Sequence, residues 1–428
     1  MIAAILFIAF ALLLAVGTPI AVCLGSSSIL AMLMQGAGRP VDTIMSSLPR
    51  LFAASSSKFV LLAIPFFILA GNIMEKAGIS ERLINLAEAC VGHLKGGLAI
   101  VCVVVACFFA AISGSGPATV AALGLVLIPG MIKTGYNAPF SAALMGCAGA
   151  IGVIIPPSIT FVVYGSIADT SIGDLFKAGV VPGLIMGAAL IICALLVGRK
   201  MDLKRLPKAT GKQRWKAFKD AFWGLLMPII ILGGIYGGIF TPTEAAAVAV
   251  VYGLIIGVFV YKTVKLKDLY RIFIDSASTT ATIMFITACA SLFAYVLTRA
   301  RIDVAISDGL INFTGGSTFV FFIIVNILLL IAGCFLDSTS ALYIFTPLFV
   351  PVAQALGIDM IHLGVVMIVN LAIGLFTPPV GVNLYVACGV ANVDLKKISK
   401  AVVPLLIASL IVLLLITYIP GISTMFTA

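Results

Sequence analysis

Two short segments combine hydroxyl side chains with helix-breaking residues inside otherwise uncharged, apolar sequence. The first tip is Ser113-Gly114-Ser115-Gly116-Pro117, with Thr119 close behind, and the second tip is Asp337-Ser338-Thr339-Ser340. Small residues and proline do not continue a helix readily, so each segment predicts a break between two helices. Hydroxyls, freed carbonyls and helix ends at one depth are ligands that a hard cation such as Na⁺ takes without a full carboxylate cage.

Each tip is followed by a second apolar run that a double proline interrupts. Pro156-Pro157 divides 134–168, and Pro378-Pro379 divides the run that starts near 360. Such a break predicts two half-helices whose unpaired backbone groups must be buried or line a cavity. We therefore pair each tip with the break that follows it. The predicted Na⁺ ligands are Ser113, Gly114, Ser115, Gly149, Gly152 and Ile155 at the first site, and Asp337, Ser338, Thr339, Gly374 and Thr377 at the second.

The alternative is that serine, glycine and proline only allow close packing and turns. Duplication argues against it, because the same pattern recurs 222 residues later along the chain. Pro129, Gly135 and the prolines 156–157 correspond to Pro351, Gly357 and the prolines 378–379. The identities fall on residues that set backbone shape, which indicates an internal repeat.

Asp337 is the one carboxylate in the stretch 309–358, and an ionisable group at membrane depth is a functional candidate. An N-cap for a helix starting at Ser338 is an equally good explanation, and both roles are compatible. For Glu244, the sequence Thr241-Pro242-Thr243-Glu244 predicts a capping box and a structural role.

The remaining reactive side chains do not form a recognisable catalytic or metal motif. His93 and His362 stand alone, and a hydrolase built from Ser113 or Ser115 with His93 lacks a G-x-S-x-G motif, so we predict no enzyme. Nine cysteines are scattered without C-x-x-C spacing and are expected to be reduced core residues. Arg299 and Arg301 could attract an anionic substrate or a docking protein, but an interfacial anchor is favoured.

Composition places these segments in a membrane. The chain of 428 residues is 62% hydrophobic and only 10% charged, whereas soluble domains carry about 25% charged residues. The apolar runs are continuous, which indicates helical spans, and Ile2–Leu24 is expected to be a retained first span. The net charge of +10 is concentrated by position, with nine Lys and Arg between Arg199 and Lys219. That pattern indicates a cytoplasmic loop and excludes nucleic-acid binding.

Charge also sets the predicted topology. No charged residue lies between Lys95 and Lys133. This stretch is too long for one span of about 20 residues and too short for two. We therefore predict that it forms a re-entrant hairpin that opens to the cytoplasm. Counting forward from the second basic cluster, around Lys262 to Arg271, makes the second hairpin open to the outside. We therefore predict an all-α integral membrane protein with inverted repeats, two re-entrant hairpins and two broken helices, an elevator-type secondary transporter.

The predicted organisation has five parts. They are N-terminal scaffold spans (1–76); a first repeat (77–198) with a hairpin at 96–132 and a broken helix at 138–168; a basic cytoplasmic loop (199–221); further scaffold spans (222–298); and a second repeat (299–428) with a hairpin at 309–356 and a broken helix at 360–392. A channel or membrane scaffold is the competing class, but no span shows the polar stripe that a pore needs. The chain has no Walker A motif, so ATP is not its energy source.

In this context the chain resembles the large membrane subunit of tripartite ATP-independent periplasmic (TRAP) transporters. The matching stretches are Ile64–Gly71, Ser113–Thr119, Ile155–Ser158, Gly238–Ala245 and Thr377–Gly381. The resemblance implies Na⁺-coupled uptake with two or more Na⁺ ions and no organic cofactor, an elevator movement, and location in the bacterial inner membrane. It also implies a small four-span (Q-type) membrane subunit and a periplasmic (P-type) substrate-binding protein as partners. A stand-alone dicarboxylate/Na⁺ symporter remains the alternative carrier.

The resemblance further implies a small carboxylate substrate: a C4-dicarboxylate, a sialic acid, another sugar acid or a keto acid. No arginine lies clearly at the midplane, so hydroxyls, amides and helix N-termini are expected to receive the carboxylate. The candidate substrate residues are Ser291, Ser338, Thr339, Ser340, Ser158 and Thr119.

Overall fold

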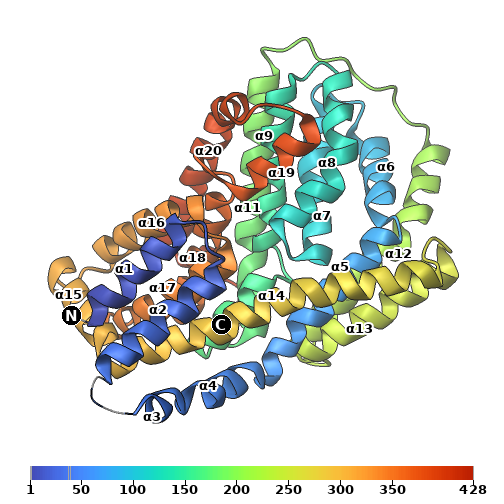
Figure 1. Ribbon diagram of the computed structural model, residues 1–428. Helices are drawn as coiled ribbons and strands as arrows, with labels where there is room; N and C mark the ends of the chain where they lie inside the picture. Colours follow the sequence, from blue (N-terminus) through green and yellow to red (C-terminus); the bar gives the residue numbers. More distant parts are fainter. Residues whose placement is uncertain (1, 37, 39, 428) are drawn as a thin grey trace.

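The computed structural model describes residues 2–36, 38 and 40–427, and its regular structure in these residues is helical (Figure 1). The helices are α1 (Ile2–Ala15), α2 (Ile20–Gln35), α3 (Val41–Met45), α4 (Ser47–Ser56), η1 (Phe59–Leu62), α5 (Ala63–Lys76), α6 (Ile79–Val91), α7 (Gly97–Ser113), α8 (Gly116–Lys133), α9 (Ala138–Ile154), α10 (Ile159–Ala168), α11 (Ile172–Gly198), α12 (Gly211–Tyr236), α13 (Pro242–Ile255), η2 (Ile256–Val260), α14 (Leu266–Arg299), α15 (Ile302–Thr314), α16 (Thr318–Phe335), α17 (Ser338–Ala355), α18 (Met360–Gly374), α19 (Val382–Ala391), α20 (Leu395–Tyr418) and α21 (Gly421–Thr424). Eight helices in the described part are long and apolar enough to cross a membrane, and the bent pair α9 and α10 would make a ninth span. The chain is therefore a multi-span membrane protein.

The helices follow the internal repeat predicted from the sequence. Adding 222 to the bounds of α8 gives those of α17, and α7, α9, α10 and α11 match α16, α18, α19 and α20 to within a few residues. The peptide bonds Pro156-Pro157 and Pro378-Pro379 are both cis. The same backbone design therefore occurs twice, because Gly135 and Gly357 and the two double prolines interrupt the helices at equivalent places.

Three predicted boundaries are wrong. Ile2–Leu24 is not one span, because Gly17, at a φ of 84°, and Pro19 separate α1 from α2, which pack against each other. The second hairpin does not begin at 309, since 302–314 forms α15, the counterpart of α6, and the first arm starts at Thr318. The segment 199–221 is a loop only as far as Thr210. A capping box of Thr210 and Gln213 starts α12 at Gly211, so most of the later basic residues are helical.

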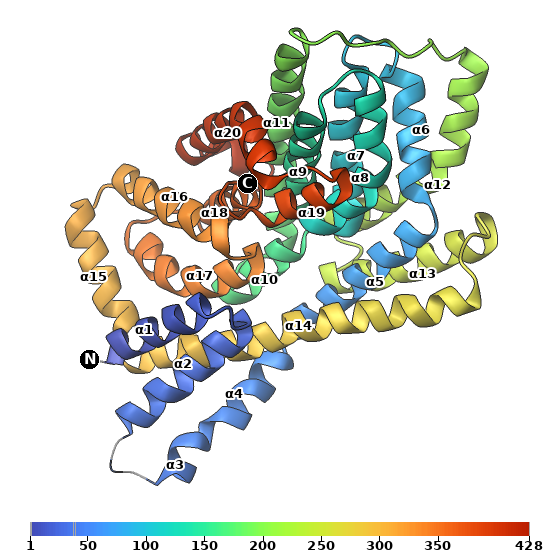
Figure 2. The same cartoon turned by 45° about the horizontal axis from the view of Figure 1, so that its top comes forward.

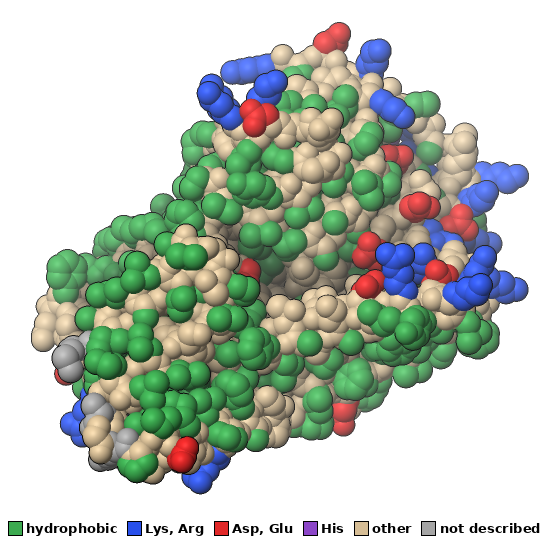
Figure 3. Space-filling model, viewed as in Figure 1, with side chains coloured by type: hydrophobic (Ala, Val, Ile, Leu, Met, Phe, Trp, Pro, Cys, Tyr) green, Lys and Arg blue, Asp and Glu red, His purple; other side chains and the backbone are tan. Residues whose placement is uncertain are grey.

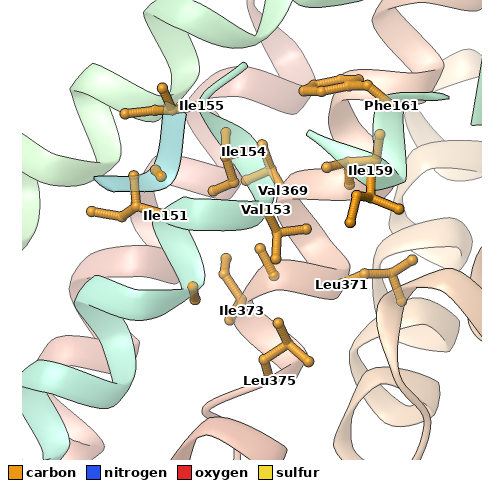
Figure 4. Close-up of a cluster of buried hydrophobic side chains, with 14 of the residues drawn as sticks. Ile151, Val153, Ile154, Ile155, Ile159, Phe161, Val369, Leu371, Ile373 and Leu375 are labelled. Atoms are coloured by element: carbon orange, nitrogen blue, oxygen red, sulfur yellow. The ribbon is translucent and has the colours of Figure 1, made fainter. Parts of the chain in front are cut away.

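The long helix α14 runs past both groups of repeat helices (Figures 1 and 2). It packs against α2, α4 and α5 and also against α17. Within the repeats, the C-terminal parts of α9 and α18 pack together and form a continuous apolar core with the residues that follow the first break (Figure 4). Ile151, Val369 and Ile373 in this cluster are fully buried. This core joins the two broken helices that lie next to the tips.

Candidate functional site

A cavity of about 480 Å³ brings the two tips together. Figure 3 shows a hollow in the molecular surface between the two groups of repeat helices. The first tip contributes Ser113 to Pro117, the second contributes Asp337 to Thr339, and α5 and α14 supply the opposite wall. Segments more than 200 residues apart in the sequence thus face one space. The cavity is the candidate site.

The first tip is held by its own hydrogen bonds. The Ser113 hydroxyl lies 2.8 Å from the Thr119 hydroxyl, which donates to the carbonyl of Ser115 at 2.8 Å. Ser115 is the N-cap residue of α8, yet its side chain makes no capping hydrogen bond. Ser115 also lines the cavity, so its hydroxyl oxygen is available as a ligand, as the predicted cation site requires.

The broken helix α9 supports this tip with its glycines. A Cβ atom on Gly152 would lie 3.2 Å from the Ser115 carbonyl oxygen, and one on Gly149 would lie 3.1 Å from that of Gly116. The structure therefore brings both glycines to the first tip, although neither lines the cavity. Ile155 follows the end of α9, and its side chain packs toward Gly183 on α11 rather than into the cavity.

At the second tip, Asp337 caps α17. One carboxylate oxygen accepts the amides of Thr339 and Ser340 at 3.0 Å, and the other accepts the Ser340 hydroxyl at 2.5 Å. The predicted N-cap is therefore confirmed. A carboxylate offers about four lone-pair positions, so one acceptor position remains for a cation. Next to it, the hydroxyl of Ser338 is buried and has no partner among the described residues.

The second break lies against the helix that leads into the second tip. A Cβ on Gly374 would lie 2.6 Å from the Cα of Gly333 in α16, so only glycine permits this approach. The amide of Gly381 donates to the carbonyl of Cys334 at 3.3 Å. Thr377 follows the end of α18 and donates its hydroxyl to the carbonyl of Ile373, four residues earlier, at 2.7 Å. Gly374 and Thr377 thus support the second tip without lining the cavity.

Only part of the predicted substrate set reaches the cavity. Ser338 and Thr339 line it, but Ser158, Thr119 and Ser340 are fully buried and hydrogen-bonded within the protein. Ser291 lies on α14 outside the cavity and donates to the carbonyl of Thr287 at 2.9 Å. These four residues do not line the cavity in this structure, and their substrate role stays a prediction.

The sequence reasoning missed the polar residues of the opposite wall. They are Asn72, Glu75, Ser278, Thr279 and Thr282; Thr160 of α10, next to the first break, also lines the cavity and was missed. Asn72 on α5 donates to the hydroxyl of Ser276 on α14 at 2.8 Å, which ties the two helices of this wall together. The cluster of Ser and Thr at 276–282 in a membrane helix was the available signal.

The other candidate residues lie outside the cavity. His362 is buried, with Nδ1 2.7 Å from the Ser423 hydroxyl and Nε2 3.2 Å from the Thr417 carbonyl oxygen. The predicted capping box of Thr241 and Glu244 is present. Arg299 donates to the hydroxyl of Tyr295 at 2.8 Å. All nine cysteines are free; the expectation of core positions is wrong for Cys90, which is exposed.

Comparisons with known proteins agree with this architecture. The chain is 46% identical over 382 residues to the C4-dicarboxylate TRAP transporter large permease protein DctM of Pseudomonas aeruginosa, with 89% of each chain covered. It is 44% identical to the isethionate TRAP transporter permease protein DctMQ of Oleidesulfovibrio alaskensis, covering 99% of this chain and 66% of that protein. It is 39% identical to the sialic acid TRAP transporter large permease protein SiaM of Vibrio cholerae, covering 85% and 84%.

The fold has solved relatives. The Alcanivorax borkumensis YdaH transporter superposes with a TM-score of 0.68 at 14% identity, covering 94% of this chain and 97% of that one. MtrF of Neisseria gonorrhoeae gives a TM-score of 0.63 at 13% identity, covering 93% and 94%. The family description "Tripartite ATP-independent periplasmic transporter, DctM component" matches residues 7–422. The chain belongs to this family: it is a large permease of the TRAP transporters, and not an enzyme.

Proposed function

We propose that this chain takes up a small organic anion across the bacterial inner membrane by coupling its movement to Na⁺. The observation that carries the proposal is the charge of the cavity. Its lining includes two carboxylates, Glu75 and Asp337, and no lysine, arginine or histidine among the described residues. An organic anion would be repelled from such a cavity unless cations entered with it. Free hydroxyl oxygens at both tips suit Na⁺ as that cation.

The two helices that start at the tips differ in a way that suggests where the substrate carboxylate binds. At α17, Asp337 already accepts the amides of Thr339 and Ser340. At α8, the N-cap side chain of Ser115 leaves the first turn uncapped. Helix N-termini favour anions through unpaired amides and the helix dipole. We infer that the carboxylate meets the start of α8, while Asp337 draws a cation to the second tip.

The substrate class follows the relatives, whose names give C4-dicarboxylate, isethionate and sialic acid. We infer that this chain carries an acid of this kind. We further infer an elevator movement, in which the two inverted repeats carry the tips past the wall built by α5 and α14. A small Q-type membrane subunit and a periplasmic binding protein would complete the system. The relative named DctMQ supports the Q-type partner.

The test is uptake into proteoliposomes that contain the chain with its small subunit and binding protein. Binding of succinate, sialic acid and isethionate to the binding protein first selects the labelled substrate. We expect uptake under an inward Na⁺ gradient and none under a proton gradient alone. Equal uptake with protons would contradict Na⁺ coupling, and robust uptake by the chain without its partners would favour the stand-alone symporter.

A further inference from the structure

A second large hollow lies outside the transport cavity, on the side of the molecule where basic residues gather. This groove has a volume of about 750 Å³ and is formed by the start of α6, the first part of α12 and the turn after η2. Its charged lining residues are Arg82, Lys216, Lys219, Glu81 and Asp220. Three cations and two carboxylates therefore face one space, and none of them takes part in the transport site.

Contacts between its three elements hold the groove in shape. The Nη1 atom of Arg82 donates to the carbonyls of Ala77 and Gly78 at 2.9 and 2.8 Å. The guanidinium lies 3.7 Å from the ring centroid of Tyr261, and the Tyr261 hydroxyl donates to the carbonyl of Asp220 at 2.8 Å. These contacts link α6, α12 and the turn after η2. Arg82 is thus oriented in advance, with further N–H donors free to bind a ligand.

The charges in the groove do not neutralise one another. The ion pairs within 4 Å in the described part of the chain are Lys76 with Asp268, Lys177 with Asp174, and Arg271 with Asp275. None of the five charged groove residues is in such a pair. Opposite charges that stay apart around one space leave separate positions for an anionic and a cationic group of one ligand.

The sequence of α12 places the groove at the membrane surface. Lys212, Lys216 and Lys219 occupy its first turns, and an apolar stretch follows from Phe222. Trp215, 59% exposed, stacks on Phe218 at a centroid distance of 5.6 Å. Lysines together with exposed aromatic rings mark the interface between headgroups and hydrocarbon, and clustered basic residues mark the cytoplasmic leaflet.

Apolar surface leads from the groove toward the hydrocarbon. Trp223 and Val260 line the groove and are each 39% exposed, and Phe259 beside Val260 is 71% exposed. A water-soluble anion would not use this surface. A phospholipid would, because its acyl chains continue from the headgroup into the bilayer.

We propose that the groove binds a phospholipid with a phosphoethanolamine headgroup from the cytoplasmic leaflet. The phosphate meets Arg82, Lys216 and Lys219, and the ammonium donates to Glu81 and Asp220. The two carboxylates select this headgroup because its ammonium gives them charge-assisted hydrogen bonds, whereas the glycerol of phosphatidylglycerol is neutral and the trimethylammonium of phosphatidylcholine has no N–H to give them. This site is independent of the proposed transport function.

The experiment uses the purified full-length chain, delipidated in detergent, with binding followed by native mass spectrometry and thermal unfolding. The probes are phosphatidylethanolamine, phosphatidylglycerol, phosphatidylcholine and water-soluble phosphoethanolamine. We expect phosphatidylethanolamine to bind at least tenfold more tightly than the others and to raise the melting temperature. Equal binding of phosphatidylglycerol, or of phosphoethanolamine without acyl chains, would overturn the proposal.

Two variants test the residues. Lys216→Ala/Lys219→Ala is expected to weaken phosphatidylethanolamine binding about tenfold, and the control Lys397→Ala/Lys400→Ala removes the same charge from exposed positions of α20 without effect. Glu81→Gln keeps the shape of the side chain and is expected to reduce the preference over phosphatidylglycerol. If the lysine pair leaves binding unchanged, or Glu81→Gln leaves the preference unchanged, the groove does not recognise this headgroup.

Discussion

Replacing Asp337 with asparagine separates the two roles of this residue. The carboxylate makes three hydrogen bonds at the start of α17, so Asp337→Ala would remove the cap, at a cost of about 1 kcal/mol, and would leave the Ser340 hydroxyl without its partner. Asparagine is an equally good N-cap. Its carbonyl oxygen can accept the two amides, and its NH₂ can donate to the Ser340 hydroxyl. Asp337→Asn therefore keeps the hydrogen bonds of the tip, while it removes the negative charge and replaces one carboxylate oxygen by an NH₂ group.

The expected effect on Na⁺ follows from the difference between charged and neutral contacts. A hydrogen bond or ligand contact to a charged group contributes about 1.5–3 kcal/mol, compared with about 0.5–1.5 kcal/mol for a neutral one. The loss of about 1–2 kcal/mol raises the Na⁺ concentration for half-maximal uptake by roughly 5- to 30-fold. The melting temperature should stay close to that of the parent protein.

Ser115→Ala tests the equivalent position at the first tip. The Ser115 side chain makes no capping bond, so its removal should leave stability unchanged. If the hydroxyl binds the ion, the loss of this neutral contact costs about 0.5–1.5 kcal/mol, which is roughly a 2- to 10-fold rise in the Na⁺ required. Ser317→Ala is the matched control, because Ser317 is also an N-cap residue without a capping bond, at the far end of α16.

The assay is initial uptake against Na⁺ concentration, normalised to folded protein in the membrane, with thermal unfolding measured on the same samples. We expect shifted Na⁺ curves for Ser115→Ala and Asp337→Asn and an unchanged curve for Ser317→Ala. Unshifted curves for both tip variants, with normal folding, would refute the reasoning and leave the tips as helix caps alone.

Two further predictions concern packing and charge in the same region. Gly374→Ala should lower the free energy of unfolding by about 1–3 kcal/mol, because its Cβ would lie 2.6 Å from the Cα of Gly333. The control Gly389→Ala should leave stability unchanged, because no atom lies within 4 Å of its new Cβ. Equal melting temperatures for the two variants would show that α16 and α18 can separate at no cost. Glu75→Gln removes one of the two cavity carboxylates and should lower the substrate concentration for half-maximal uptake by a few-fold at limiting Na⁺, since less negative charge opposes the anion. Uptake curves against substrate concentration at low and high Na⁺ measure this, and an unchanged or higher half-saturating concentration would contradict it.

Local backbone chemistry explains why so much of the repeat could be predicted from the sequence. Clustered glycines and prolines interrupt a helix in an apolar run, whereas isolated ones such as Pro129 and Pro182 lie inside helices here. Gly114, Gly116 and the double prolines therefore marked the first tip and both broken helices in the sequence, whereas the second tip was marked by Asp337 as an N-cap residue. Asp337 as a cap and the capping box at Glu244 were predictable for the same reason, because capping depends on residues three positions apart.

The boundaries that failed carried local signals that the sequence reasoning did not use. The segment 199–221 was predicted as one loop, although Thr210 and Gln213 have the spacing of a capping box and start α12 within it. The helix α15 was merged with the hairpin because no charged residue after Asp308 marks its end, and a pair of glycines in the left-handed conformation ends it.

The sequence by itself determined the membrane setting, the all-helical class, the repeat and the two tips, because each depends on composition or on neighbours along the chain. Only the tertiary structure decided which polar groups face the cavity. Ser340 and Thr119 have the right chemistry, but local hydrogen bonds turn them inward, whereas Glu75 and Thr282 reach the cavity from helices far away in the sequence. The orientation of a side chain on a helix is set by what the helix packs against, and that information is spread over the whole fold.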